Sequence, residues 1–267
     1  VSLSGTTALV GAPGRDTDGP QSGAAYVFAA ADGRLVDQLE PFSSTAGFDA
    51  TGSGFGRAVD ASDDYLVVGA PGEFPPDGSF SIGGVGAVYV YDADTRRLIG
   101  KAFADDAEFA ENLGSAVAVS GDTVVASAPF DRANGDESGS IYLIDARTAE
   151  QTAMITPSDG AARDRFGLDV DIAGGTIAAG APFDDDLGTD SGSVYLFDAS
   201  TGAEIAKLTA PDGAAGDRFG SAVAIDGSRL IVGAPGAGAG AVHVFDLDTG
   251  SLLTTLHASD GAEGDGL

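Results

Sequence analysis

The sequence is built from a tandem repeat, and this periodicity limits what the chain can fold into more than any other feature. A tripeptide of a small residue, Ala and Pro occurs five times, with prolines 58, 58, 53 and 53 residues apart: Pro13, Pro71, Pro129, Pro182 and Pro235. An aromatic residue or Leu followed by Gly precedes the last four copies: Phe55-Gly56, Leu113-Gly114, Phe166-Gly167 and Phe219-Gly220. Self-similarity at such a period indicates an array or ring of equivalent units.

Each repeat reads as four short β-strands. After the tripeptide comes a Gly and then a run in which β-branched and aromatic residues alternate, which predicts a strand. A turn of the pattern Asp-x-x-Thr-Gly follows, clearest at Asp198–Gly202 and Asp246–Gly250, and a further strand comes after it. No stretch of useful length has helical periodicity. In the last unit the predicted strands are Ser221–Ile225, Arg229–Val232, Ala241–Phe245 and Leu252–Leu256.

These units predict an all-β fold, a β-propeller of four-stranded blades with five repeats visible. A four-stranded unit cannot bury both faces of its own sheet, so the units must pack against one another. Radial packing leaves only short, protected edges. A linear solenoid would need shorter rungs, and a sandwich would not need five copies of one unit. We expect residues 1–267 to form a single propeller domain, with repeats at 1–54, 55–112, 113–165, 166–218 and 219–267.

The Phe-Gly step, the alternating strand and the Gly-Ala-Pro tripeptide together resemble the FG-GAP repeat, which is found in integrin α-subunit propellers and many microbial surface proteins. The resemblance covers essentially the whole chain. It implies an extracellular or cell-surface propeller that mediates adhesion or binds protein or glycan ligands through its loops. The family typically closes with seven blades. The five units here are either a ring that shares one blade between the two chain ends or an excerpt of a longer array, and we favour the excerpt.

Acidic loops after the tripeptide are the candidate metal sites, and calcium is the one cofactor they suggest. Calcium takes six to eight oxygen ligands, which clustered carboxylates on Gly-containing loops can supply. Integrin-type repeats often carry a calcium loop between the first two strands, but those turns are tight hairpins here. Because the spacing matches no established calcium pattern, solvated surface loops are the alternative interpretation. The candidate ligands are Asp16, Asp18, Asp131, Asn134, Asp136, Asp184, Asp186 and Asp190.

The longest loop, Gly72–Gly84, is the candidate partner-binding segment. It carries Phe74, Phe80 and Ile82, an apolar content unusual for a surface connection. Exposed aromatic residues mark contacts with partners. The alternative is that these side chains fold back over their own blade or pack on a neighbouring one.

Two further recurrences suggest structural roles. Three Asp-Gly turns precede a Phe-Gly or Leu step, and their Asp side chains are expected to cap backbone N–H groups, with Arg165 and Arg218 as neighbouring ion-pair partners. The turns are Asp159–Asp164, Asp212–Asp217 and Asp260–Asp265. One position of the third strand forms a ladder that we expect to serve packing: Tyr26, Tyr89, Tyr142, Tyr195 and His243.

The charge and the missing motifs exclude several classes of function. The chain has 41 acidic and 13 basic residues, a formal charge of −28, so nucleic acids and anionic membrane surfaces are poor partners. There is no Cys, and no apolar run approaches the roughly 18 residues of a membrane span. No catalytic motif is recognised, so we predict no enzyme. The alternatives are a self-assembling structural subunit of a surface filament, sheath or large assembly, and, remotely, a carboxylate-dependent glycoside hydrolase.

Overall fold

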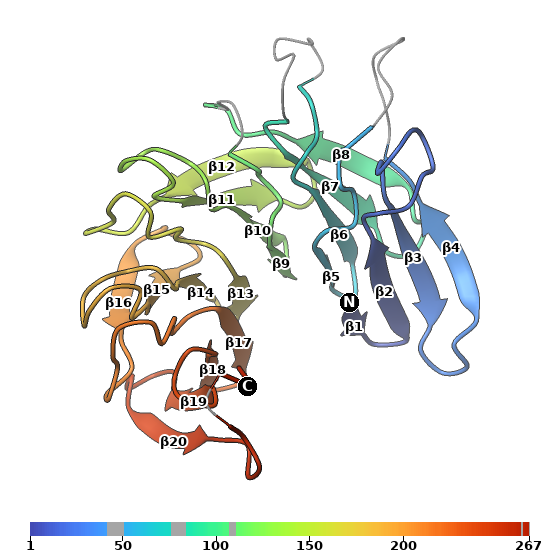
Figure 1. The fold of residues 1–267 in the computed structure, drawn as a ribbon. Coiled ribbons are helices and arrows are strands. Elements are labelled where there is room, and N and C mark those ends of the chain that lie inside the picture. The colour runs from blue at the N-terminus through green and yellow to red at the C-terminus, as the bar shows by residue number, and fades with distance from the viewer. Residues whose placement is uncertain (42–50, 76–83, 107–110, 263, 267) are drawn as a thin grey trace. The chain divides into compact units, whose positions relative to one another are not determined.

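The computed structural model describes residues 1–41, 51–75, 84–106, 111–262 and 264–266. In these residues all regular structure is β: twenty strands form five antiparallel four-stranded sheets, and no helix is present (Figure 1). Consequently no described helix could cross a membrane. The prediction of an all-β fold built from four-stranded, propeller-type blades is confirmed.

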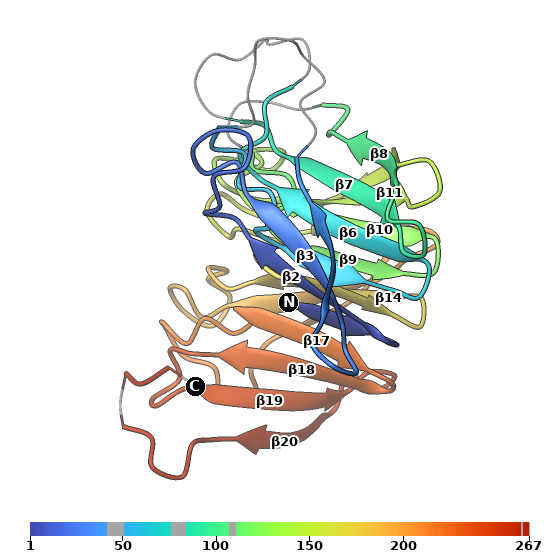
Figure 2. The ribbon, with the colours of Figure 1, turned by 90° about the vertical axis from the view of Figure 1, so that its right-hand side faces the viewer.

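Within each sheet the strands lie side by side in sequence order, as Figure 2 shows for β17 to β20. The first sheet contains β1 (Ser2–Ser4), β2 (Thr7–Ala12), β3 (Ala24–Ala29) and β4 (Leu35–Leu39). The second contains β5 (Val59–Ala61), β6 (Tyr65–Ala70), β7 (Ala87–Asp92) and β8 (Leu98–Ala102). The third contains β9 (Val117–Ser120), β10 (Thr123–Ala128), β11 (Ser140–Asp145) and β12 (Glu150–Ile155). The fourth contains β13 (Val170–Ala173), β14 (Thr176–Ala181), β15 (Ser193–Asp198) and β16 (Glu204–Leu208), and the fifth contains β17 (Ala222–Asp226), β18 (Arg229–Ala234), β19 (Ala241–Asp246) and β20 (Leu252–Leu256).

The chain forms two compact units. The first comprises Val1–Ala128 and Tyr142–Ala153, and the second comprises Pro129–Ile141 and Met154–Leu267. The first unit therefore holds the first two sheets and most of the third. The second holds the last two sheets together with the loop between β10 and β11. That loop contributes Glu137 to the candidate site of the second unit.

The turns follow the local sequence. The hairpins between first and second strands are tight, as predicted; Ala173 pairs with Thr176, for example. In the turn after β15, the Asp198 carboxylate accepts hydrogen bonds from the backbone and hydroxyl of Thr201, both at 2.9 Å. The equivalent Asp246 bonds Thr249 in the same way. Just before this turn the pairing with the fourth strand shifts register in the first, second, fourth and fifth sheets, which marks a recurrent β-bulge.

Within each unit, the Phe-Gly step docks one sheet onto the preceding one. In the second unit the backbone N–H of Phe219 donates to the carbonyl of Ser191, at 3.0 Å, and its ring is fully buried. In the first unit Phe55 bonds Ser22 in the same way, at 3.2 Å. The step also reaches the tripeptide of its own sheet, since Gly220 donates to the carbonyl of Gly233. The two parts of the repeat motif are therefore one contact between neighbouring sheets.

The tyrosine ladder packs in the sheet cores, as predicted. Tyr89, Tyr142 and Tyr195 are fully buried, His243 is nearly so, and Tyr26 is half-buried. The Phe166 ring meets Tyr195 edge-on, with centroids 5.5 Å apart and planes at 90°. Such edge-to-face contacts add to the burial of the rings.

Edge strands of neighbouring sheets are connected by aspartates. The carboxylate of Asp171, on β13, accepts the backbone N–H of Ile225, on β17, at 2.6 Å. The Asp169 carboxylate accepts the backbone N–H of Val223 at 2.8 Å. Burial raises the pKa of Asp169, and this hydrogen bond offsets part of the increase. In the first unit the Asp60 carboxylate accepts the backbone N–H of Val119 at 2.8 Å. These bonds satisfy edge N–H groups that would otherwise be open to other strands.

Candidate functional site

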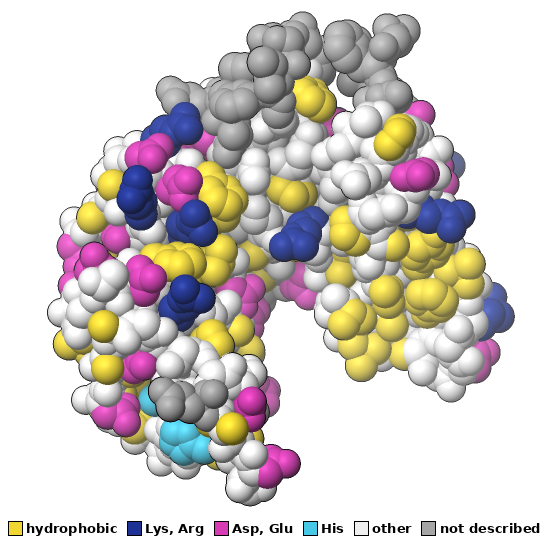
Figure 3. Space-filling model, in the orientation of Figure 1, with side chains coloured by type: hydrophobic (Ala, Val, Ile, Leu, Met, Phe, Trp, Pro, Cys, Tyr) yellow, Lys and Arg dark blue, Asp and Glu magenta, His cyan; other side chains and the backbone are white. Residues whose placement is uncertain are grey.

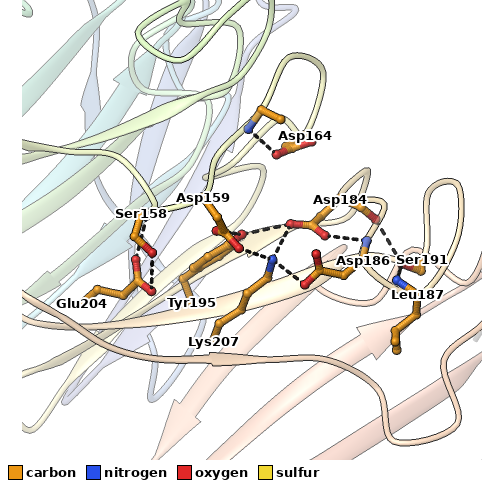
Figure 4. A network of polar contacts seen from close by, with 11 residues as sticks. Ser158, Asp159, Asp164, Asp184, Asp186, Leu187, Ser191, Tyr195, Glu204 and Lys207 are labelled. Carbon is orange, nitrogen blue, oxygen red and sulfur yellow. Dashed lines mark hydrogen bonds and ion pairs between the residues drawn. The ribbon is translucent and has the colours of Figure 1, made fainter.

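Lys207 lies at the centre of the densest polar network of the second unit (Figure 4). It stands on β16 directly opposite Tyr195 of β15, so both side chains leave the same face of the sheet. Its ammonium lies 2.8 Å from a carboxylate oxygen of Asp159, 3.0 Å from Asp184 and 2.6 Å from Asp186. It also lies 5.1 Å from the centre of the Tyr195 ring. Three carboxylates and an aromatic face thus surround one cation.

The electrostatics of this network keep its proton donors protonated. Burial and the nearby Asp184 raise the pKa of Tyr195, whose hydroxyl is 2.8 Å from Asp159 and 2.9 Å from Asp184. Burial opposes the charge of Lys207, but its hydrogen bonds to three carboxylates outweigh this and raise its pKa. Burial likewise opposes the charge of Asp159, yet the bonds from Lys207 and Tyr195 bring its pKa below the ordinary value. Lys207 therefore remains charged, and Tyr195 neutral, at neutral pH.

The structure separates the three calcium ligands predicted in this loop. Asp184 is buried, and one of its oxygens accepts the backbone N–H of Asp186 at 3.0 Å. Both residues face Lys207, so the ammonium occupies the space between them. Asp190 instead borders a cavity on another side of the loop. Calcium binding in this loop remains a prediction, and it would require displacement of Lys207.

The other predicted metal ligands make local contacts in their own loops. Asp131 is buried and accepts the backbone N–H of Ala133, at 2.7 Å. Asn134 is exposed, and Asp136 forms an ion pair with Arg132, at 3.3 Å. Asp16 accepts the backbone N–H of Gln21 at 2.8 Å, and Asp18 is exposed. Among the described residues, no group of three or more His, Asp or Glu side chains is arranged to hold a metal ion.

The predicted partner-binding loop is described only in part. Phe74 is half-buried and follows the buried Glu73. Phe80 and Ile82 lie outside the described residues. The prediction for this loop therefore stays open.

The first unit contains a smaller version of the Lys207 network. Lys101 lies opposite Tyr89 and contacts Glu73 at 2.6 Å, while the Tyr89 hydroxyl donates to Glu73 at 3.1 Å. Sequence reasoning missed both networks, although the sequence contained a signal. The chain has only two lysines, and each stands twelve residues after a tyrosine of the ladder. In both repeats the second residue after the proline of the tripeptide is acidic: Glu73 and Asp184.

A column of alternating aromatic rings and guanidinium groups runs through the loops of the second unit. The Arg165 guanidinium lies 5.1 Å from the centre of the Phe130 ring and 5.0 Å from that of Phe183. Arg218 lies 5.4 Å from Phe183. Arg165 also donates two hydrogen bonds to one oxygen of Glu137, at 2.9 and 2.6 Å. Cation–π contacts of this kind are strongest where water is excluded.

The column explains an arginine pattern that the sequence analysis interpreted differently. Arg165 and Arg218 were expected to pair with the Asp-Gly turns, but Arg165 pairs with Glu137 and both stack on Phe183. Both stand just before a Phe-Gly step, and in each case the residue after the preceding tripeptide is Phe. In the two earlier repeats the Phe after the tripeptide is replaced by Gly14 and Gly72. The Arg before the Phe-Gly or Leu-Gly step is replaced by Gly54 and Asn112.

The capping role of the Asp-Gly turns is confirmed. The carboxylates of Asp164, Asp217 and Asp265 each accept the backbone N–H three residues earlier, at 2.7, 2.8 and 2.7 Å. Asp164 is the most enclosed of them, and burial raises its pKa to about 6. Asp159, at the start of its turn, belongs instead to the Lys207 network.

Beside the column lies a cavity of about 480 Å³. Over the loops of the second unit, Figure 3 shows basic side chains interspersed with acidic and hydrophobic ones. The polar groups lining the cavity come from three loops, 131–139, 161–165 and 183–190: Glu137, Arg163, Arg165, Asp185, Thr189 and Asp190. Its volume falls in the usual range of small-ligand sites, about 300–1,000 Å³. Both hydrogen-bond donors and acceptors therefore line a ligand-sized space.

The two histidines of the chain line a smaller cavity of about 250 Å³ in the fifth sheet, together with Asp212 and Asp217 (Figure 3). Burial lowers the pKa of His243, and one of its ring nitrogens lies 3.2 Å from the hydroxyl of Thr255. His257 has a ring nitrogen 3.4 Å from the carbonyl of Gly240. The ring of His243 also packs on Phe219, so its packing role is confirmed.

Comparison with known proteins supports the repeat assignment. The family model described as FG-GAP repeat matches residues 1–28, 97–144, 149–197 and 203–245, more than half of the chain. No curated protein matches the chain. Three of the matched segments begin at or near the fourth strand of one sheet and end on the third strand of the next. The sequence repeat thus spans two neighbouring sheets, with the Phe-Gly contact between them.

Proposed function

Because the chain belongs to the FG-GAP repeat family, we propose that it is a non-catalytic, extracellular or cell-surface propeller whose loops bind a protein or glycan partner in adhesion. The observation that carries the proposal is the cavity of the second unit. It is walled by loops rather than strands, and loops on a rigid scaffold are where binding residues concentrate.

The polar networks of the second unit support a binding role over a catalytic one. Lys207 and Tyr195 are held in their protonated forms by the carboxylates around them. A general base or nucleophile needs a pKa near the working pH or an activating partner. The Asp164 carboxylate accepts the backbone N–H of Ala161 and so caps its own turn. These groups stabilise loops, and the loops in turn shape the cavity.

The experiment is a binding and turnover assay on the purified chain. We expect saturable binding to a defined glycan or to a purified surface protein, and no release of product from polysaccharides or esters. Turnover of a polysaccharide that is lost on substitution of a single carboxylate would overturn the proposal in favour of a glycoside hydrolase.

A structural role in a larger assembly is the second candidate. The fourth strands of the last two sheets expose large apolar side chains: Ile205 on β16 and Leu253 and Leu256 on β20, each more than half exposed. Apolar groups on an edge strand favour association between chains. Sedimentation analysis at increasing protein concentration tests this, and a purely monomeric species at every concentration would count against it.

A further inference from the structure

We propose that the cavity beside the Arg165 column is a sugar-binding site, specific for uncharged, hydroxyl-rich glycans. The inference rests on the proposed binding function and names its ligand class. Its lining combines guanidinium donors, from Arg163 and Arg165, with carboxylate acceptors, from Glu137, Asp185 and Asp190. A sugar hydroxyl both donates and accepts hydrogen bonds, so a wall that contains both donors and acceptors suits adjacent hydroxyl groups.

The charge of the lining argues against polyanionic ligands. Its three carboxylates outnumber its two guanidinium groups, and the whole chain carries a formal charge of −28. A polyanion would approach against this field, which falls off with distance and salt. An uncharged ligand meets no such barrier. Thr189 adds a hydroxyl that can donate or accept at the same cavity.

Arg163 is the residue that most clearly indicates a ligand. Its side chain is exposed at the cavity, and among the described residues it forms no ion pair. Its backbone φ is +76°, in the left-handed region that favours glycine. The equivalent residue of the next repeat is Gly216, with a φ of +86°. The turn itself therefore accepts glycine, and an arginine held there against its conformational preference points to a role in binding.

The site is not repeated in the next unit of the array. In the next repeat, Gly216 replaces Arg163, and Gly236 replaces Phe183. The scaffold therefore repeats without the cavity chemistry. The remaining N–H groups of Arg165 are preoriented, because Phe130, Phe183 and Glu137 hold its guanidinium in place. A preorganised guanidinium loses little freedom when it binds a ligand.

The experiment uses the full chain and a panel of defined oligosaccharides: neutral hexoses, N-acetylhexosamines and uronic-acid oligomers. We expect binding to neutral members, measured by calorimetry, with an affinity that stays within about twofold in roughly 1 M salt, where charge interactions are screened beyond about 3 Å. Arg163→Gly, which copies the next repeat and relieves its turn, should weaken binding at least about tenfold while the melting temperature stays equal or rises.

Arg132→Ala is the matched control, because it removes an exposed arginine of the 131–139 loop whose own side chain does not line the cavity; we expect unchanged affinity. Sugar binding that Arg163→Gly leaves intact, or binding confined to uronic acids and abolished by salt, would overturn the inference. Binding to purified, deglycosylated surface proteins without any sugar binding would also overturn it, yet leave the proposed adhesive function standing. Enzymatic turnover would instead remove that function itself.

Discussion

At the scale of single residues, the two lysines show how a very acidic chain handles its buried charge. Each lies opposite a ladder tyrosine, and each neutralises the acidic residue that follows the tripeptide, Glu73 in one sheet and Asp184 in another. Carboxylates placed together raise one another's pKa unless a cation lies between them. The lysine provides that cation from within the chain, and the tyrosine ring provides a face for it.

Substitution of Lys207 by Met, the residue that the preceding repeat has at the same position, tests this role. The change leaves Asp159, Asp184 and Asp186 without their common cation, so we expect a loss of about 2–3 kcal/mol in the free energy of unfolding. Urea unfolding followed by circular dichroism measures it. Arg132→Met, which removes an exposed ion pair, should change stability by less than about 1 kcal/mol. Equal effects of the two variants would refute the assigned role.

The same variant tests the calcium prediction. In the wild type the ammonium already fills the space between Asp184 and Asp186, so we expect chelation to leave the melting temperature unchanged. In Lys207→Met the empty carboxylate cluster should bind calcium, which would raise the melting temperature by mass action. A wild-type melting temperature that falls on chelation would contradict this expectation and locate calcium in another of the acidic loops.

Asp164 gives the second unit a defined dependence on pH. Burial raises its pKa to about 6, against about 3.9 in an unfolded chain. The native state therefore holds this proton more tightly, so the group's contribution to stability is complete below about pH 4 and is lost as the pH rises through about 6. Asp164→Asn should match the wild type near pH 4 and be about 1–2 kcal/mol more stable near pH 8.

Thermal unfolding across this pH range provides the measurement. Asp217→Asn, which changes the equivalent capping residue of the next repeat, is the control, because that side chain is more exposed. A stability difference for Asp164→Asn that stays constant with pH would show that the carboxyl does not titrate in this range.

At the scale of elements, the close approach of backbone between neighbouring sheets explains the glycine of the tripeptide. A Cβ atom on Gly180 would lie 1.9 Å from the carbonyl oxygen of Gly220, in the Phe-Gly step of the next sheet. In the first unit, Gly11 stands in the same relation to Gly56. Any side chain at Gly11 or Gly180 would push the neighbouring sheets apart. Glycine at these two positions therefore allows the sheets to pack closely.

Gly180→Ala is therefore expected to destabilise the protein by about 3 kcal/mol or more, because the obstructing atom belongs to the backbone and cannot turn away. Gly233→Ala is a matched control in the fifth sheet, where the nearest atom to the added Cβ is that of Ala222, at 3.5 Å. We expect that variant to lose less than about 1 kcal/mol. Denaturant unfolding measures both, and similar losses would contradict the steric explanation.

At the scale of the whole molecule, the formal charge of −28 acts on stability through self-repulsion. Many of the acidic groups are exposed, and at 0.1 M salt the interactions between exposed charges more than about 10 Å apart are largely screened. The charge thus opposes the compact state most strongly in dilute buffer, while the buried ion clusters are affected less.

We therefore expect the melting temperature to rise by several degrees between low salt and roughly 1 M salt. Calorimetric scans in NaCl and KCl should agree, because screening depends on ionic strength and not on the identity of the cation. A melting temperature that rises in one salt alone would indicate a specific cation site, and one that falls with salt would contradict the repulsion argument.

Much of the fold could be predicted because its determinants are local. The alternation of β19, the capping Asp246 and the tight turns follow from residues close together in the chain. The candidate site was predicted less well. Asp184 and Asp186, predicted as candidate calcium ligands or solvated loop residues, do lie together. The sequence did not predict that the ammonium of Lys207, from the second strand along, lies between them, and calcium binding there stays a prediction. The Arg163 cavity was missed, because three separate loops form it.

The sequence by itself determined the repeat, the four strands of each unit and the glycines and aromatic residues that join one unit to the next, since period and turn chemistry are properties of neighbouring residues. Only the tertiary structure decided which charges meet. Lys207 and Asp159 are far apart in the chain, and so are Arg165 and Phe130. Their contacts depend on strand register and on how loops of successive sheets pack, which no local pattern specifies.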